Sequence, residues 1–310
     1  MITYKALSTE DLDLFGTYPY EPSPDVGLEH RIKPGEYLAS GHYRPEWMWV
    51  ALDDGVAVAR MAFWSFPGDD EAKCVDWFEI GERADRVAVG GELVRRAYAA
   101  VHKGPELPPS YLVFAPAEWR GRDGVRELIE DRIAAAEAGG LSVFVERHGF
   151  RWTPENGLPE RPTRLTFATA EDEEFVAAVA DSYTGTLDAY SGDGTTRNGA
   201  HATAAEEVGD MLKYPRGRDW WRLAHDADGS LVGAIFPADN GGSPVIGYIA
   251  VMPGHRGKGY VDDLLAEMMH ALVDEGAEKI TANTDLANVP MKAAFDRAGF
   301  VTSSCRIDLR

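Results

Sequence analysis

The chain has 310 residues, of which 45% are hydrophobic, and this is enough for two ordinary domains with their own cores. Its formal net charge of -20 argues against general nucleic-acid binding, because phosphate backbones require a basic face. No apolar run approaches the roughly 18 residues of a membrane-spanning helix. The first residues also lack the basic and apolar segments of a signal peptide.

The two cysteines and the spacing of the histidines do not indicate a metal site or a disulfide framework. Cys74 and Cys305 are the two cysteines, and they lie far apart in the sequence. No His-x-x-x-His pair occurs, so no metal site is predicted. We therefore expect a soluble cytoplasmic protein with no metal, no nucleic-acid partner and no membrane partner. The negative charge either attracts cationic partners or only maintains solubility.

The first half of the chain predicts an alternation of strands and helices. A β-type run from Ile2 leads into a helix, and residues 49–63 form two strands joined by an Asp-Gly turn, which is typical of a hairpin. Further strands are predicted at 74–80 and 111–115, and a long helix is predicted at 122–138. The motif "RHGF", which ends at Phe150, closes this half.

The second half repeats this order. A β-type run from Leu165 leads into a helix, a second Asp-Gly hairpin covers 221–236, and an apolar strand covers 244–251. The motif "RAGF" ends at Phe300, which is 300 − 150 = 150 residues after its counterpart. The Pro-rich stretch 153–164 marks the boundary. The pattern predicts two α/β domains, 1–160 and 163–310.

One turn in the second half carries positive charge against the acidic background. After the strand 244–251, Arg256 and Lys258 alternate with Gly257 and Gly259, and a one-faced helical pattern follows. A strand, a glycine turn and a helix start aim backbone N–H groups into one space, which suits a phosphate or carboxylate. The alternative is an ordinary exposed turn whose helix dipole is already complemented by acidic residues.

This turn and a later motif together resemble the GNAT superfamily of acyl-CoA-dependent N-acetyltransferases. Its pattern Arg/Gln-x-x-Gly-x-Gly/Ala is matched from Arg256 to Gly259, with Val261 at the last position. Its pattern Asn-x-x-Ala-x-x-x-Tyr-x-x-x-Gly-Phe is matched by "NVPMKAAFDRAGF", where Phe295 takes the place of Tyr. With the repeat, the resemblance implies two tandem domains of α/β class (α+β by some schemes), each a mixed, mostly antiparallel sheet flanked by helices.

The resemblance implies acetyl-CoA as co-substrate, with no metal. Backbone groups at the strand end would pair with the pantetheine arm and help to stabilise the oxyanion, and the turn would hold the pyrophosphate. Asn288 either contacts the cofactor or only caps the following helix. The expected cofactor-binding residues are Val251, Met252, Arg256, Gly257, Lys258, Gly259, Tyr260, Val261, Asn288 and Phe295.

The first half is expected to have lost this site, which makes 1–160 a degenerate domain without cofactor. Its corresponding loop, "GERADRVAVGGELV", carries Glu82 and Asp85, which would repel phosphates. Its glycine pair, Gly90 and Gly91, falls inside the predicted helix. The acetyl-CoA site is therefore assigned to 163–310.

The catalytic groups are less evident from the sequence. Phe295 cannot donate the proton that a Tyr there would give to the thiolate, so Tyr248 and Tyr260 are alternatives, and Tyr248 is equally a candidate core residue. Asp285 is a candidate base, or a turn aspartate. The region 181–201 would lie on the substrate side, and its candidates for amine binding are Asp188, Tyr190, Asp193 and His201.

Two functions remain open at this point. The first is an N-acetyltransferase in which a small-molecule amine attacks acetyl-CoA directly in the C-terminal domain. The alternative is a non-catalytic acyl-CoA-binding or regulatory protein, favoured by Phe295 and by the absence of a carboxylate on the strand 244–251. The chain is expected to be a monomer or a homodimer.

Overall fold

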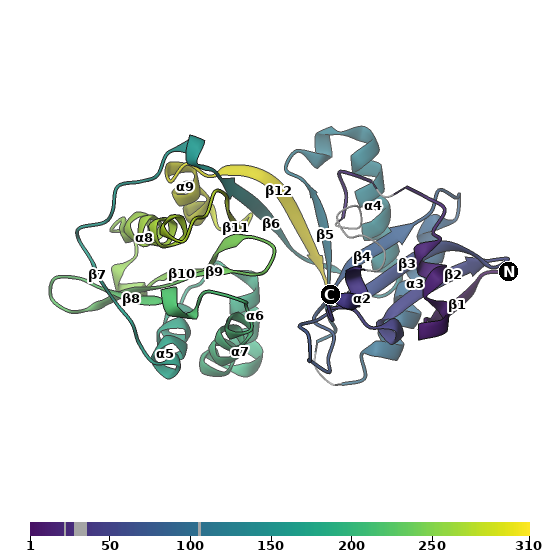
Figure 1. Cartoon of the computed structure of the whole chain (residues 1–310), viewed down its shortest axis with the longest axis horizontal. Helices are drawn as coiled ribbons and strands as arrows, with labels where there is room; N and C mark the ends of the chain where they lie inside the picture. Colours follow the sequence, from purple (N-terminus) through teal and green to yellow (C-terminus); the bar gives the residue numbers. More distant parts are fainter. Residues whose placement is uncertain (22, 28–35, 105–106) are drawn as a thin grey trace. The chain divides into compact units, whose positions relative to one another are not determined.

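The computed structural model describes residues 1–21, 23–27, 36–104 and 107–310 (Figure 1). By its contacts the chain forms two compact units. The first comprises residues 1–146 together with 304–310, and the second comprises residues 147–303. Each unit is a mixed, mostly antiparallel sheet flanked by helices, which confirms the predicted fold class.

The first unit follows the predicted order of elements. Its strands are β1 (Thr3–Ala6), β2 (Met48–Asp53), β3 (Val56–Trp64), β4 (Cys74–Ile80) and β5 (Ser110–Pro116). Its helices are α1 (Leu12–Gly16), α2 (Glu36–Ala39), α3 (Arg86–Val101) and α4 (Asp123–Ala138). Neighbouring strands are antiparallel except for the parallel pair β4 and β5. Gly90 and Gly91 lie in α3, as predicted, where they face Ala135 and Ala138 of α4 and permit close helix packing.

The second unit repeats this topology. Its strands are β7 (Thr166–Ala168), β8 (Arg222–His225), β9 (Leu231–Asp239), β10 (Pro244–Val251) and β11 (Ile280–Asp285). Its helices are α5 (Asp172–Ser182), α6 (Ala189–Asn198), α7 (Ala200–Leu212), α8 (Tyr260–Asp274) and α9 (Val289–Arg297). β10 and β11 are again the parallel pair. In Figure 1, α8 and α9 cover one face of these strands, and α5, α6 and α7 cover the other.

Each half of the sequence supplies the last strand of the other half's sheet. β6 (Val143–Trp152) pairs antiparallel with β11 from Arg147 onward, and Phe150 and Trp152 are buried in the core beneath α8. β12 (Val301–Leu309) pairs antiparallel with β5 from Ser304 onward, and its buried side chains join the first core. The expected ranges 1–160 and 163–310 followed chain order, so they differ from the compact units at these two strands.

Candidate active site

A cavity of about 480 Å³ opens in the second unit, between the end of β10 and the start of α9. Strand β10, the turn after it, the first turn of α8 and the region from 182 to 207 contribute to its wall. The residues that line it include Arg147, Asp188, Glu207, Tyr248, Ile249, Val251, Arg256, Gly257, Gly259, Tyr260, Val261, Asn288 and Phe295.

The cavity exists because β10 and β11 separate. The two parallel strands pair at Val245 and Thr281, and β10 then carries a bulge at Gly247, opposite β9. A side chain on Gly247 would overlap Met211 and approach the carbonyl oxygen of Phe236, so the bulge requires glycine. The separation also explains why most of β10 is half-buried although its sequence is apolar, a pattern that is typical of a buried strand.

The open edge of β10 presents backbone groups to the cavity. The N–H of Met252 donates to the carbonyl oxygen of Val232 on β9, at 2.8 Å. Backbone groups alternate in direction along an antiparallel ladder, so those of Ile249 and Val251 point away from β9, towards the cavity. Val251, one of the expected cofactor-binding residues, therefore directs its N–H away from β9. The expectation for Met252 is corrected, because its N–H is already hydrogen-bonded within the sheet.

The glycine turn has the backbone of an anion site. Gly257 and Gly259 have φ values of +76° and +77°, which side chains other than glycine adopt with strain, and Gly259 is the N-cap of α8. In the described part of the chain, no hydrogen-bond acceptor is recorded for the backbone N–H groups of residues 257–261. Five successive donors at a helix N-terminus suit a phosphate.

The charged side chains of the turn differ in their role. Arg256 donates to the carbonyl oxygens of Ser182 and Thr184, both at 2.6 Å, and of Gly185 and Val251, both at 3.2 Å. Its guanidinium thus fastens the turn to the C-terminal end of α5, which corrects the expectation that its charge faces the ligand. Lys258 is exposed and has no ion-pair partner among the described residues.

Two residues of the second motif lie at the cavity wall. Asn288 caps α9, because its Oδ1 accepts from the N–H of Met291 at 3.3 Å, and its side chain also borders the cavity. Both readings of Asn288 are therefore compatible with the structure. Phe295 is buried between Phe150 and Phe300, with ring centroids at 4.7 and 5.1 Å, yet it also borders the cavity.

The three expected catalytic residues are placed differently. The hydroxyl of Tyr248 lies 2.7 Å from Ser182 Oγ, and burial raises the pKa of this tyrosine further above its ordinary value. Tyr260 begins α8 and borders the cavity, with the guanidinium of Arg164 4.8 Å from its ring centroid. Asp285 is buried and is not among the lining residues, so this geometry does not favour its expected role as base.

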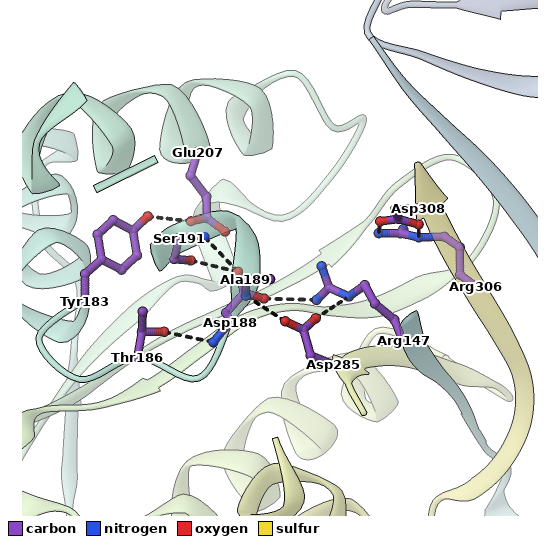
Figure 2. A network of polar contacts seen from close by, with 10 residues as sticks. All are labelled: Arg147, Tyr183, Thr186, Asp188, Ala189, Ser191, Glu207, Asp285, Arg306 and Asp308. Atoms are coloured by element: carbon purple, nitrogen blue, oxygen red, sulfur yellow. Dashed lines mark hydrogen bonds and ion pairs between the residues drawn. The ribbon is translucent and has the colours of Figure 1, made fainter. Parts of the chain in front are cut away.

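Asp285 belongs to a buried ion network that holds the substrate side together (Figure 2). Its Oδ2 accepts from the N–H of Ala189 at 2.6 Å, and its Oδ1 lies 3.1 Å from Arg147 Nε. The same guanidinium lies 3.2 Å from Asp188 Oδ2, while Asp188 Oδ1 caps α6 by accepting from Ser191. Arg147 on β6 thereby connects β11 to the start of α6.

Of the four expected substrate residues, Asp188 alone borders the cavity. Asp193 pairs with Arg197 one turn along α6, and His201 pairs with Glu173 at the exposed start of α7. Tyr190 is half-buried on α6 and does not line the cavity. These three expectations are corrected, because none of the three residues lines the cavity and two of them are held in ion pairs outside it.

Sequence reasoning missed Glu207 of α7, which borders the cavity. Tyr183 donates its hydroxyl to Glu207 Oε2 at 2.5 Å (Figure 2). The buried stripe of α7 consists of Ala204, Val208 and Met211. Glu207 lies on the same stripe, three residues after Ala204. A carboxylate on an apolar helix face was therefore the signal that could have identified it.

In the first unit, the edge of β4 that corresponds to the open edge of β10 is occupied by a side chain of the protein itself. β4 carries its bulge at Asp76, so Phe78 corresponds to Ile249. The carbonyl oxygen of Phe78 accepts from Arg132 of α4 at 2.9 Å, and the Arg132 side chain is buried. In the loop after β4, Arg83 pairs with Asp53 and Asp85, and Tyr20 packs against Gly81.

Comparisons with known proteins agree with this geometry. Residues 186–300 match the model of the acetyltransferase (GNAT) family. A mycothiol acetyltransferase of Clavibacter sepedonicus is 25% identical over 197 residues, which cover 63% of this chain and 58% of that protein. The match therefore spans less than two thirds of that relative's length.

Two solved structures cover nearly the whole chain. A GCN5-related N-acetyltransferase from Sphaerobacter thermophilus has a TM-score of 0.63 and 16% identity, over 99% of this chain and 94% of its own. A tandem GNAT protein from the clavulanic acid biosynthesis pathway has a TM-score of 0.54 and 16% identity, over 100% and 98%.

Among the described residues, none of the helices has the length and apolar character needed to cross a membrane. The same residues contain no cluster of three or more His, Cys, Asp or Glu side chains that could hold a metal ion. The turn after β10, the family match and the likeness over the whole chain lead to one conclusion: residues 186–300 match the acetyltransferase (GNAT) family, and the chain as a whole has the tandem GNAT fold.

Proposed function

We propose that the protein is an N-acetyltransferase that moves an acetyl group from acetyl-CoA to the amine of a small molecule, by direct attack in the second unit. The observation that carries the proposal is the row of N–H groups at residues 257–261, which have no hydrogen-bond acceptor among the described residues and lie next to the open edge of β10. The N–H groups suit a dianionic pyrophosphate, and the open strand edge suits an extended pantetheine amide chain.

The chain's residues would act as follows. The N–H of Val251 or Ile249 would donate to the acetyl oxygen as it becomes an oxyanion, and one such donor stabilises a tetrahedral intermediate by about 3–4 kcal/mol. Asn288 and Tyr260 would border the pantetheine arm. The thiolate leaves from a cavity in which Tyr248 is engaged with Ser182, so no proton donor for it is assigned.

Incubation of the full chain with acetyl-CoA and a panel of small amines, followed by measurement of free thiol, tests the proposal. Thiol release that depends on the amine, with the acetylated amine found by mass spectrometry, supports it. If the protein binds acetyl-CoA and acetylates no amine, the alternative of a non-catalytic acyl-CoA-binding protein is favoured. One observation favours that alternative: Phe295 is buried at the position where the family motif has Tyr.

We expect one acetyl-CoA site per chain. In the first unit the guanidinium of Arg132 engages the backbone carbonyl that corresponds to the open edge of β10, and the loop carries Glu82 and Asp85. A pyrophosphate would meet negative charge there. Titration calorimetry of the full chain should give a stoichiometry of one. Two equivalent sites per chain would contradict the assignment to the second unit.

Phe295→Tyr is expected to raise the rate of thiol release by no more than about 30-fold. A thiol with a pKa of about 8.5 leaves unprotonated near pH 7 at a penalty of roughly 2 kcal/mol, and a hydroxyl could remove this penalty. Because Phe295 borders the cavity, the hydroxyl should reach it without loss of stability.

Phe300→Tyr is the matched control, because Phe300 is buried in the same aromatic cluster and does not line the cavity. It should lower stability by about 1–3 kcal/mol through an unpaired buried hydroxyl. If Phe295→Tyr is equally destabilised and no faster, Phe295 belongs only to the core.

The cellular compartment and the oligomeric state of the protein are also open to test. The free thiols of Cys74 and Cys305 support the cytoplasm as the compartment, since reducing conditions keep thiols unpaired. We propose a small amine as the partner and a monomer or homodimer as the assembly. Gel filtration coupled to light scattering tests the second point.

A further inference from the structure

Glu207 is a carboxylate that lines the cavity and is hydrogen-bonded through one of its oxygens. Its Oε2 accepts from Tyr183, while no hydrogen-bond donor to Oε1 is recorded among the described residues. Asp188 also borders the cavity, but both its oxygens are engaged, one by Ser191 and one by Arg147. Among the carboxylates that line the cavity, Glu207 is therefore the one able to meet a ligand.

The surroundings of Glu207 favour its uncharged form. Burial, with smaller contributions from Asp188 and Asp210, raises its pKa to about 7, against the opposing effects of Tyr183 and Arg147. Arg147 lies between Asp188 and Asp285, so its positive charge is shared by two other carboxylates. From β10, the neutral phenol of Tyr248 faces Glu207 as well.

The local charge indicates which ligand fits. Charged side chains at this end of the cavity include Arg147 and the carboxylates of Asp188, Asp210 and Asp285, and Glu207 adds a negative charge when it is deprotonated. One guanidinium faces three carboxylates, so an anionic acceptor would be repelled and an ammonium attracted. Tyr183 holds Glu207 by Oε2, and Glu207 lines the same cavity that the open edge of β10 borders.

We propose that Glu207 binds the ammonium group of the acceptor substrate through Oε1 and accepts its proton. This inference rests on the proposed acetyl transfer. It defines the acceptor as a primary or secondary amine that is cationic in solution, and it assigns the base that the sequence did not reveal.

The step balances in protons and electrons. The ammonium transfers one proton to Glu207, and the neutral amine then attacks the thioester carbonyl carbon, forming a C–N bond. Collapse of the tetrahedral intermediate breaks the C–S bond, and the electron pair leaves on sulfur. The second amine proton neutralises the thiolate, and Glu207 returns its proton to solvent. The products are the amide, free coenzyme A thiol and one proton.

The test compares Glu207→Gln with Glu206→Gln. Both glutamates lie side by side on α7, and Glu206 is exposed. The acceptor is the small amine that the parent protein acetylates best, and kcat/KM is measured as a function of pH from the release of free thiol. Glu207→Gln should lose about 10²–10⁴-fold in kcat/KM and should lack the acidic limb near pH 7. Glu206→Gln should match the parent.

Stability supplies a readout that a merely structural role would not produce. The folded pKa of Glu207 lies above its unfolded value of about 4.3, so its ionisation destabilises the folded protein as pH rises from about 4.3 to about 7. Gln keeps an acceptor for Tyr183 and carries no charge. Glu207→Gln should therefore be as stable as the parent at pH 4.5 and more stable at pH 8, while being less active.

Failure of this inference can be distinguished from failure of the proposed function. If the parent acetylates an amine and Glu207→Gln keeps its rate and pH profile, Glu207 is not the base. If the parent acetylates no amine, acetyl transfer itself fails. In that case the titration of Glu207 is followed by carbon-13 NMR of protein labelled at its glutamate carboxyl groups. The Glu207 signal is the one missing from the spectrum of Glu207→Gln. Titration near pH 7 that shifts on addition of n-propylammonium retains Glu207 as an amine site, and titration near pH 4.3 without a shift overturns it.

Discussion

Gly259→Glu is expected to abolish acetyl-CoA binding and to leave the fold intact. Gly259 has a φ of +77° and begins α8, and an added Cβ atom would meet nothing closer than an Arg164 nitrogen at 3.8 Å. The strain of the left-handed backbone costs about 1–2 kcal/mol, which a folded domain tolerates. The new carboxylate, however, would lie among the N–H groups of residues 257–261, where the pyrophosphate is proposed to bind.

The size of the effect follows from electrostatics. Two like charges about 4 Å apart near a protein surface repel by about 4 kcal/mol, which corresponds to roughly a thousandfold loss of affinity. Gly276→Glu is the matched control, because Gly276 has a φ of +91°, has open space around it and follows the other end of α8. Calorimetry should show loss of binding in the first variant and retention in the second.

The melting temperatures of both variants complete the experiment. Equal, small decreases show that the loss of binding in Gly259→Glu comes from the site and not from unfolding. Unchanged affinity for coenzyme A in a folded Gly259→Glu would mean that the glycine turn is only a turn, and the proposed cofactor site would then be wrong.

The isolated fragment 163–310 is expected not to fold, whereas the fragment 147–303 is expected to fold. The first lacks Arg147–Trp152, which pairs with β11 over six residues and places Phe150 and Trp152 in the core at 1% exposure each. Loss of one buried Phe or Trp side chain costs about 3–5 kcal/mol, so loss of both approaches the whole stability of a domain. The second fragment keeps all six strands of the unit.

Circular dichroism and thermal melting distinguish the fragments, which are of similar length. Fragment 147–303 should melt cooperatively and bind acetyl-CoA, because the whole cavity wall lies within it. Fragment 163–310 should be insoluble or lack near-ultraviolet signal. Cooperative melting of 163–310 would show that β6 is dispensable, which would contradict the packing of Phe150 and Trp152.

The sequence was sufficient for the elements and for the position of the glycine turn. The strand predicted at 244–251 is β10, and the helix predicted at 122–138 is α4 within one residue. Both follow from local signals, namely an apolar run ended by Pro253 and an apolar stripe with helical spacing. Gly257 and Gly259 were recognisable for a related reason, because a positive φ is a property of the residue's own backbone.

The roles of individual side chains were harder to predict from the sequence. Arg256 was expected to face an anion, and in the structure it donates to four carbonyl oxygens of other segments. Asp193 and His201 have the right chemistry for amine binding, but each points into a local ion pair outside the cavity. Direction and distance across elements decide such roles, and neither is encoded in spacing along the chain.

By itself, the sequence determined the repeat, the order of strands and helices in each half, and the place of the glycine turn, since periodicity and backbone preference act over a few neighbouring residues. The tertiary structure alone decided that each half completes the other's sheet, because strand pairing depends on which edges meet in space. It also decided that Arg132 fills the first unit's site, and that Glu207, rather than Asp285, reaches the cavity. These outcomes depend on contacts between residues far apart in the chain, where packing and burial outweigh local sequence.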